Sequence, residues 1–279
     1  MVAGRIDERR NELTPAERRI ADVVLTHPQA VAFGTVADVA RRAETSGATV
    51  VRFAMKLGYS GFSELQEEVQ GELSHRLRPA AERIRERQPS EVVTSAMSIE
   101  LDNVQGTLEG IDRRTFNAVV SRLADPKGQV FVLAGATTRG IGLLLADDLA
   151  MLRGRIHLLE GGDVQAARRS VDVERSDTLV VLDFRRYEHW VLEAVRRTGQ
   201  HGAYVVALTD SALSPLADLA DATFVIAAQG AGPFDSHVGT LALVNALVAG
   251  LAAKVQTSAT ARLDRIEDAW RAAGSLVDR

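Results

Sequence analysis

The stretch QVFVLAGATTRG at residues 129–140 joins a short apolar run to a glycine, two threonines and the start of a helical pattern. Further apolar runs of strand length follow at Arg155–Leu159, Thr178–Phe184, Tyr204–Thr209 and Thr223–Ala227. Most of these runs are too continuous for half-exposed strands, and helical stretches separate them, which is typical of parallel strands covered on both faces. The pattern predicts a doubly wound, mostly parallel five-stranded α/β domain.

The residues before this region have a pattern that is typical of short helices. Thr14-Pro15-Ala16-Glu17 supplies a helix cap, a proline for the first turn and a carboxylate three residues after the cap. A pair of short helices is predicted at about residues 35–42 and 46–57, separated by three or four residues. We therefore expect an all-helical domain at residues 1–75, a polar, proline-containing linker at 76–90, and the α/β domain with leading helices at 91–279.

The composition is that of an ordinary globular protein, with 279 residues, 46% hydrophobic and 25% charged. The absence of cysteine excludes disulfide bonds, thiolate metal sites and a cysteine nucleophile. The first residues, MVAGRIDERRNEL, carry charges where a signal peptide has an apolar core. The apolar stretch Leu241–Val255 is shorter than the roughly 20 residues that a membrane span needs. These features predict a cytoplasmic protein.

The net charge of −4 is unevenly distributed along the chain. Residues 1–88 carry 14 basic and 13 acidic side chains, whereas the remaining residues carry 19 basic and 24 acidic ones. Only the first block can approach a polyanion without strong repulsion, and its basic residues must then share one face. The charge therefore permits nucleic-acid binding by the first block without predicting it.

The spacing of the two short helices is that of a helix-turn-helix, in which the second helix enters the major groove of DNA. Arg52 would then pair with guanine, Thr49 would touch a thymine methyl group, and Lys56 would lie near phosphate. Arg41 and Arg42 would hold the DNA backbone on the flank. The spacing equally permits a helical dimerisation bundle with a basic outer face, so both interpretations remain open at this point.

Two runs of residues resemble the DNA-binding domain of RpiR-type transcriptional regulators. They are TVADVA at residues 35–40 and SGATVVRFAMKLGYSGFSEL at residues 46–65. The resemblance implies that this domain binds a double-stranded DNA operator. The residues expected to contact the DNA are Thr35, Ser46, Ala48, Thr49, Arg52 and Lys56. Glu44 stands where the family usually has a glycine in the turn.

Members of this family join the helix-turn-helix to a SIS (sugar isomerase) domain, which residues 129–256 resemble. The stretch ALTDSALSPLADLAD at residues 207–221 is a good match to the fourth strand of that domain and the segment after it. The resemblance implies a phosphosugar-type ligand and a homodimer or homotetramer. In open α/β sheets, ligands lie outside the carboxyl ends of the strands, near the switch in strand order. The expected ligand-binding residues are Gly135, Thr137, Thr138, Arg139, Asp183, Arg185, Arg186 and Ser236.

The loop after the third predicted strand departs from this pattern. Asp183-Phe184-Arg185-Arg186-Tyr187-Glu188 stands where SIS domains usually have a serine-rich phosphate loop. The two arginines favour an anionic ligand, a sugar phosphate or a related acid, because guanidinium binds phosphate and carboxylate through a planar fork. An equally open alternative is that they pair with acidic neighbours or with another subunit. Thr138 can likewise serve only as a helix cap, and Asp235 or Ser236 as the cap of the last long helix.

No other chemistry stands out in the sequence. The histidines lack the spacing of metal ligands, and neither a GxGxxG nor a GK[ST] motif occurs, so we expect no metal, nucleotide or other cofactor. Taken together, the residues and the resemblance predict a transcriptional regulator whose SIS domain senses a small anionic metabolite and changes operator affinity. The alternative is a sugar-phosphate isomerase, whose general base would be sought among Glu160, Asp183, Glu188 and His237. A protein-interaction module that binds no small molecule also remains open.

Overall fold

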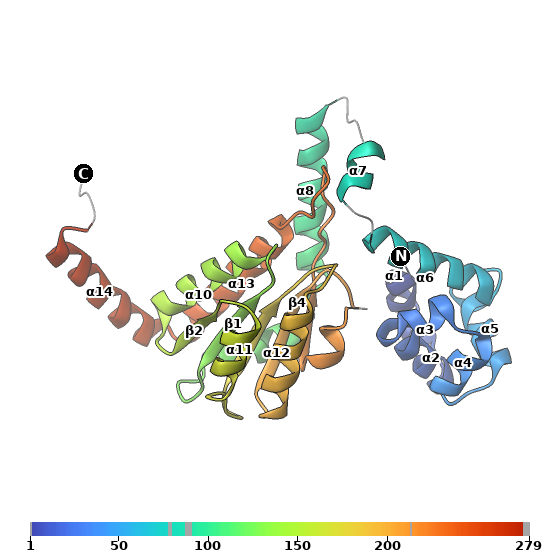
Figure 1. Ribbon diagram of the computed structural model, residues 1–279, viewed down its shortest axis with the longest axis horizontal. Helices are drawn as coiled ribbons and strands as arrows, with labels where there is room; N and C mark the ends of the chain where they lie inside the picture. Colours follow the sequence, from blue (N-terminus) through green and yellow to red (C-terminus); the bar gives the residue numbers. More distant parts are fainter. Residues whose placement is uncertain (1, 78–79, 87–90, 213, 276–279) are drawn as a thin grey trace. The chain divides into compact units, whose positions relative to one another are not determined.

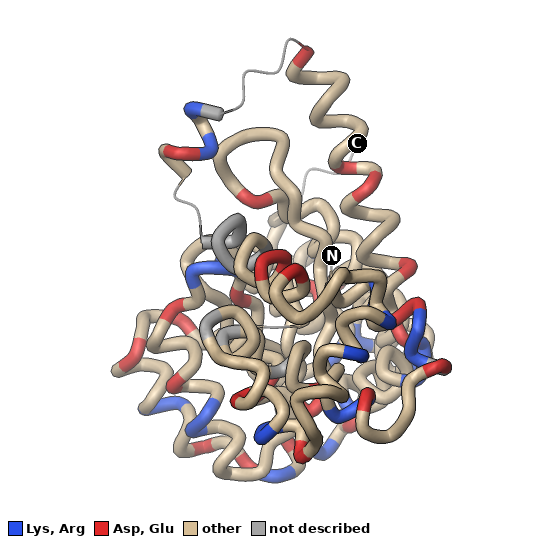
Figure 2. Tube along the Cα trace, turned by 90° about the vertical axis from the view of Figure 1, so that its right-hand side faces the viewer, with Lys and Arg blue, Asp and Glu red and all other residues tan. Residues whose placement is uncertain are grey.

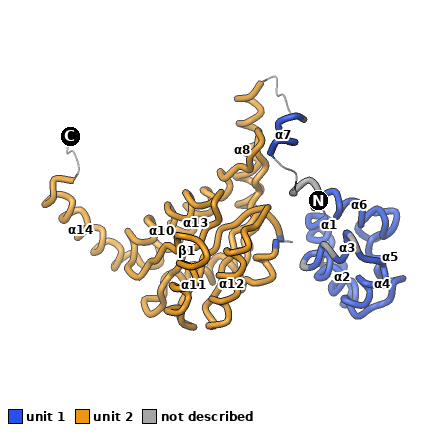
Figure 3. The backbone as a smooth tube through the Cα atoms, viewed as in Figure 1, with its two compact units in different colours: residues 1–86, 212–214 blue, residues 87–211, 215–279 orange. Residues whose placement is uncertain are grey.

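The computed structural model describes residues 2–77, 80–86, 91–212 and 214–275. The chain divides into two compact units, one formed by residues 1–86 and 212–214 and the other by residues 87–211 and 215–279 (Figure 3). Of the expected linker at 76–90, residues 78–79 and 87–90 lie outside the described residues. The described part of that segment includes the short helix α7 (Ala80–Glu86).

In the first unit, helices are the only regular secondary structure among the described residues (Figure 1). Besides α7, its helices are α1 (Val2–Glu8), η1 (Arg10–Glu12), α2 (Pro15–Thr26), α3 (Pro28–Phe33), α4 (Val36–Arg42), α5 (Gly47–Lys56) and α6 (Phe62–Leu77). Thr14 and Glu17 form the expected capping box at the start of α2. This helix ends at Thr26, before Pro28, which is the first residue of α3. Apolar residues from α1 to α6 share one core, in which Phe53 and Leu65 are fully buried.

The second unit begins with two helices, α8 (Val92–Glu109) and α9 (Arg113–Leu123), and then alternates strands and helices. These are β1 (Val130–Ala134), α10 (Arg139–Leu152), β2 (Ile156–Leu159), α11 (Asp163–Ser170), β3 (Thr178–Leu182), α12 (His189–Gln200), β4 (Tyr204–Thr209), η2 (Ala217–Leu219), β5 (Ala222–Val225), α13 (Val238–Lys254) and α14 (Gln256–Ala273). Each of the five strands lies within two residues of its predicted bounds. The predicted fold class is confirmed.

The strands form one parallel sheet in the order β2-β1-β3-β4-β5. The strand order changes direction between β1 and β3, so the carboxyl ends of these neighbouring strands flank a crevice suited to ligand binding. The register pairs Ala134 at the end of β1 with Leu182 at the end of β3. The loops that follow β1 and β3 therefore begin side by side.

Two apolar layers cover the sheet. On one face, alternate strand residues such as Val132 and Val180 pack against α9, α10 and α13. On the other face, the intervening residues such as Leu133 and Val181 pack against α11 and α12. This double burial explains why β1 and β3 are buried at every position.

Within the described residues, no single helix is long and apolar enough to cross a membrane. Only α13 and α14 pass that test of length and composition as a pair, and a bend of 103° separates them.

Candidate functional site

Helices α4 and α5 meet at a tight turn in which Glu44 has a left-handed backbone, with φ of 48°. This conformation favours glycine, which is the residue that the resemblance predicts there. Arg19 braces the turn, donating hydrogen bonds from Nε to the carbonyl of Ala43 at 2.9 Å and from Nη2 to that of Glu44 at 3.1 Å. The turn of this chain is therefore held from α2.

The first turns of α5 carry polar side chains on an accessible surface. Ser46 caps the helix by accepting from the backbone N–H of Thr49 at 3.3 Å, and the hydroxyls of these two residues lie 2.8 Å apart. Arg52 is exposed and donates to Thr49 Oγ1 at 3.3 Å, and Ala48 is exposed as well. Thr49 itself is half-buried. The structure thus brings four of the six predicted DNA-contacting residues together at the start of one helix.

The two remaining predicted contacts, Thr35 and Lys56, have partners within the unit. Thr35 caps α4, where its hydroxyl accepts from the N–H of Asp38 at 3.2 Å and the Asp38 carboxylate accepts from the N–H of Thr35 at 2.9 Å. Lys56 donates to Glu17 Oε2 at 2.9 Å and to the carbonyl of Glu12 at 2.6 Å. Lys56 therefore ties the end of α5 to α2. Lys and Arg are interspersed with Asp and Glu along the trace (Figure 2).

In the second unit, the loops after β1 and β3 are joined by carboxylates. Glu188 accepts a hydrogen bond from the backbone N–H of Ala136, and its other oxygen accepts from the indole N–H of Trp190. A Cβ atom at Gly135 would overlap the Asp183 carboxylate and lie 3.0 Å from Glu188. A side chain at position 135 would therefore displace the Asp183 carboxylate from its place between the two loops.

Asp183 is nearly fully buried, with 2% of its surface exposed. Its carboxylate accepts from the backbone N–H groups of Phe184 at 3.0 Å and Glu188 at 2.8 Å. Burial raises the pKa of Asp183 to about 7, and the neighbouring carboxylates of Glu188 and Asp210 act in the same direction, although the two N–H groups oppose them. Asp183 organises the loop and does not face solvent.

The two threonines after β1 have different surroundings. Thr138 is fully buried and donates from its hydroxyl to the carbonyl of Leu182 at 2.7 Å, and its side chain makes no capping hydrogen bond to α10. Thr137 is exposed just before α10. Arg139 donates twice to Glu160 Oε1, at 3.1 and 2.9 Å, in an exposed ion pair. Thr137 is therefore the hydroxyl that a ligand can reach at this edge.

The arginines of the loop after β3 also differ. Arg185 forms a fork-shaped ion pair with Asp235, with Nε donating to Oδ2 at 2.8 Å and Nη2 to Oδ1, and both side chains are less than 15% exposed. This is the alternative in which an arginine pairs with an acidic neighbour. Asp210 accepts from the backbone N–H of Arg185 at 3.1 Å and from the hydroxyl of Tyr187 at 2.7 Å. Arg186 is exposed, with φ of 68°.

Ser236 is engaged by the first helix of the unit. Its hydroxyl donates to Glu100 on α8 and accepts from the backbone N–H of Val238 at 3.2 Å. The cap position of α13 itself is His237, whose burial lowers its pKa and whose ring lies 5.2 Å from that of Phe184. Ser236 thus connects α8 to the start of α13.

A cavity of about 270 Å³ opens between the carboxyl ends of β1 and β2. Its wall includes Ala136, Arg139, Glu160, Glu188 and Trp190. From the sequence, Glu188 was considered only as a catalytic base, and the roles of Trp190, Asp210 and the Asp235 ion pair were not predicted. For Asp210 and Trp190, only their positions in the sequence could have pointed to the site, because Asp210 directly follows β4 and Trp190 lies in the first turn of α12. Among the described residues, no three His, Asp or Glu side chains gather closely enough to hold a metal ion.

Comparison with known proteins agrees with this architecture. The model of the helix-turn-helix domain of the rpiR family matches residues 1–76, and the SIS domain model matches residues 122–250. The uncharacterized HTH-type transcriptional regulator YbbH of Bacillus subtilis is 24% identical over 272 residues, or 93% of either chain.

Two solved structures share the fold. The sugar isomerase domain of an RpiR transcription factor from Sphaerobacter thermophilus has a TM-score of 0.60 and 25% identity, covering 63% of this chain and 98% of that one. The Vibrio vulnificus NanR protein, complexed with ManNAc-6P, has a TM-score of 0.59 and 23% identity, and the match covers 100% of both chains.

Proposed function

This chain belongs to the RpiR family of transcriptional regulators, with a helix-turn-helix domain and a SIS domain, and we propose that a small anionic metabolite bound by the SIS domain changes its affinity for a DNA operator. The observation that carries the proposal is that Ser46, Thr49 and Arg52 form an accessible polar surface at the start of α5. A recognition helix reads base edges with side chains in this position.

In this proposal, α5 enters the major groove and Arg52 contacts a guanine. Thr49 orients Arg52 through their hydrogen bond, which reduces the side-chain entropy lost on binding DNA. Arg41, which pairs with Asp38 at 3.1 Å, and the exposed Arg42 contact phosphate at the flank. Lys56 supports the recognition helix by pairing with Glu17, and it can exchange that carboxylate for a DNA phosphate.

The effector site that we propose is the cavity beside the loop that follows β1. The start of a helix offers free N–H groups and the positive end of its dipole, and α10 is 14 residues long. Glu188 already fills part of this anion-binding position with its own carboxylate. An anionic effector would compete with Glu188 for the N–H of Ala136, while Thr137 and Arg139 contact the anionic group.

The exchange of Glu188 for an effector supplies a two-state element. With Glu188 in place, its carboxylate links the loops after β1 and β3, and effector binding would remove that link. If the effector binds one state about 100-fold more tightly than the other, the coupling is about 2.7 kcal/mol, within the usual allosteric range. The ManNAc-6P bound to the NanR protein makes a sugar phosphate the first candidate to test.

The parts of the chain have distinct tasks in this proposal. Residues 1–75 bind DNA, residues 76–90 link the domains, and residues 91–279 sense the effector. A palindromic operator requires two recognition helices, and we propose that the protein acts as a homodimer or homotetramer. A regulator of this kind works in the compartment that holds the DNA, which we take to be the cytoplasm.

The alternative proposal is a sugar-phosphate isomerase, which needs a carboxylate that reaches the substrate as a base. Asp183 has a suitable pKa of about 7, yet it is 2% exposed and its carboxylate accepts from two backbone N–H groups. Glu188 does line the cavity, and it is engaged by Ala136 and Trp190. These contacts favour binding without turnover.

The test is selection of genomic fragments by the purified protein at a stated salt concentration, with and without sugar phosphates. We expect a recurring palindrome whose enrichment changes when one of these compounds is added. If a well-folded sample enriches no sequence under any condition, the regulator proposal is wrong. Turnover of the sugar phosphates in the same sample would favour the isomerase.

A further inference from the structure

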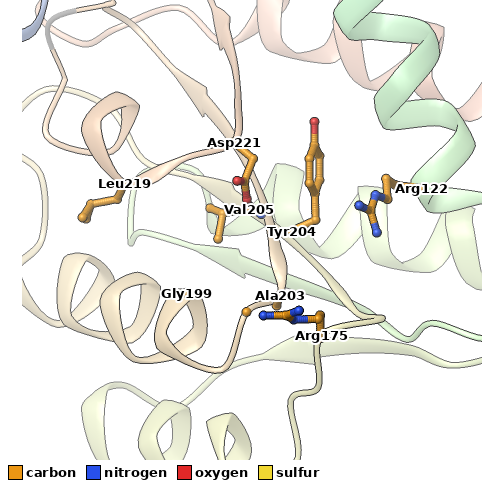
Figure 4. A pocket seen from close by; sticks show the side chains of 9 residues that line it. Arg122, Arg175, Gly199, Ala203, Tyr204, Val205, Leu219 and Asp221 are labelled. Atoms are coloured by element: carbon orange, nitrogen blue, oxygen red, sulfur yellow. Dashed lines mark hydrogen bonds between the residues drawn. The ribbon is translucent and has the colours of Figure 1, made fainter.

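A second cavity lies at the amino ends of the strands, away from the loops described above. It has a volume of about 530 Å³ and lies beside the amino end of β4 (Figure 4). Its lining includes Arg122, Arg175, Gly199, Gly202, Tyr204 and Asp221. A space of this size accommodates a small metabolite.

Two arginines of this cavity differ from those at the carboxyl ends of the strands, which we call the carboxyl edge of the sheet. Arg139 and Arg185 each pair with a carboxylate. Within the described part of the chain, the side chains of Arg122 and Arg175 form neither an ion pair nor a hydrogen bond. Both residues are exposed, and their planar forks are available to an oxyanion.

Each of the two arginines lies against another residue of the cavity lining. Arg122 stacks on the ring of Tyr204, with its central carbon 4.8 Å from the ring centroid (Figure 4). Arg175 lies against Gly202, where a Cβ atom would be 3.3 Å from its Nε. Gly202 has φ of 82°, so the backbone there disfavours any side chain that would fill the cavity.

A hydrogen-bond acceptor completes the cavity. Asp221 accepts from the backbone N–H of Val205 at 2.8 Å through Oδ2, which fixes its orientation. Its other oxygen can accept from a ligand hydroxyl. The lining thus combines two cationic forks, an aromatic face and one fixed carboxylate, which suits a hydroxylated molecule with an oxyanion group.

We propose that this cavity is a second ligand site, which binds a small hydroxylated metabolite through a phosphate or carboxylate group held by Arg122 and Arg175. The site goes beyond the proposed function, because none of its residues belongs to the carboxyl-edge cavity or to the DNA-binding unit. Binding here does not require that the protein recognise an operator or respond to an effector at Thr137.

The test is titration of the full-length protein with inorganic phosphate and, separately, with citrate, against sodium chloride at equal ionic strength. The arginine Nε–Hε resonances in NMR spectra report each guanidinium individually. We expect one of the two probes to shift the Arg122 and Arg175 resonances together. Arg122→Ala or Arg175→Ala should weaken that binding at least tenfold, because each guanidinium supplies charged hydrogen bonds to the anion.

Further variants localise the binding to this cavity. Tyr204→Phe keeps the ring under Arg122 and should retain binding, whereas Tyr204→Leu removes the stack and should weaken it. Arg113→Ala removes another exposed arginine of α9 and should change nothing. Thr137→Val alters only the carboxyl edge, so the affinity at Arg122 should persist even if the proposed effector site fails. If neither probe shifts these resonances more than chloride does, or if both alanine variants bind like the wild type, the proposal is wrong.

Discussion

Glu188 reaches across the switch in strand order and accepts a hydrogen bond from the backbone N–H of Ala136. The loop at the start of α10 is thereby bound by a carboxylate of the chain itself, at the position that an anionic ligand would occupy. The protein thus carries an internal competitor for its proposed effector, and this relationship makes the effector site open to direct test.

We expect Glu188→Gln to increase the affinity for inorganic phosphate at this edge about tenfold, because it removes a negative charge next to the bound anion. Calorimetric titration at constant ionic strength measures the change, with both proteins carrying Arg122→Ala so that the other proposed anion site does not contribute. Glu193→Gln is the matched control, since it neutralises a carboxylate of α12 that pairs with Arg196 instead. Unchanged or weaker phosphate binding by Glu188→Gln would show that Glu188 does not compete with anions.

The raised pKa of Asp183 predicts that the stability of the protein depends on pH. Its pKa is raised to about 7 in the folded protein by burial, while the unfolded chain releases this proton near pH 4, at roughly the ordinary value of the group. Between these values the folded state binds more protons, so the contribution of Asp183 to stability is greatest below about pH 4 and falls as the pH rises to about 7. The slope is at most about 1.4 kcal/mol per pH unit, and it levels off above about pH 7.

Replacing this carboxyl should flatten the pH profile. Asp183→Asn cannot take up the proton, so its free energy of unfolding should lack the decline between about pH 5 and 7. The amide has one acceptor oxygen for the two N–H groups, so this variant should be less stable overall. Urea denaturation across this pH range, extended to about pH 8, provides the comparison. Asp172→Asn, at an exposed position, should keep the wild-type slope. An equal slope in Asp183→Asn would assign the decline to other groups.

The fold could be predicted from the sequence because it depends on repeated local patterns. The continuous apolar runs identified all five strands, and the cap at Thr14 identified the start of one helix. The two helices predicted from residues 35 and 46 are capped by Thr35 and Ser46. The roles of individual site residues depend instead on contacts between distant segments. Arg185 and Asp235 are 50 residues apart, and Thr138 bonds to a carbonyl 44 residues away. No local pattern reports such pairings.

The pair formed by Arg185 and Asp235 should be strongly coupled. Removing one partner leaves a charge of low exposure without its counterpart, so Arg185→Ala and Asp235→Ala should each cost about 3 kcal/mol of stability. The double variant should cost clearly less than the sum of the two, giving a coupling of about 2 kcal/mol in a double-mutant cycle from urea denaturation. Additive effects would mean that the ion pair contributes nothing specific to this loop.

At the left-handed turn between α4 and α5, we expect a substitution that stabilises the protein. Glu44→Gly relieves a backbone conformation that costs a non-glycine residue about 1 kcal/mol, partly offset by the greater freedom of glycine in the unfolded chain. We expect a small gain in the melting temperature of the helical unit, and Glu44→Ala, which keeps a Cβ, should show none. A lower melting temperature in Glu44→Gly would mean that the Glu44 side chain itself stabilises the turn.

Arg52 provides the sharpest test of DNA recognition. Its side chain is exposed and donates only to the neighbouring Thr49 Oγ1 among the described residues, so Arg52→Ala should keep the fold and the wild-type melting temperature. The same change should cost about 1–3 kcal/mol of specific operator binding and relax the preference for guanine at one position.

Arg41→Ala is the matched comparison, because a phosphate contact carries no sequence information. This variant should weaken binding to all sequences alike and reduce the salt dependence of the affinity. Binding of the selected operator and of a scrambled duplex at two salt concentrations separates the two effects. An Arg52→Ala protein with unaltered preference at every operator position would remove α5 from the recognition surface.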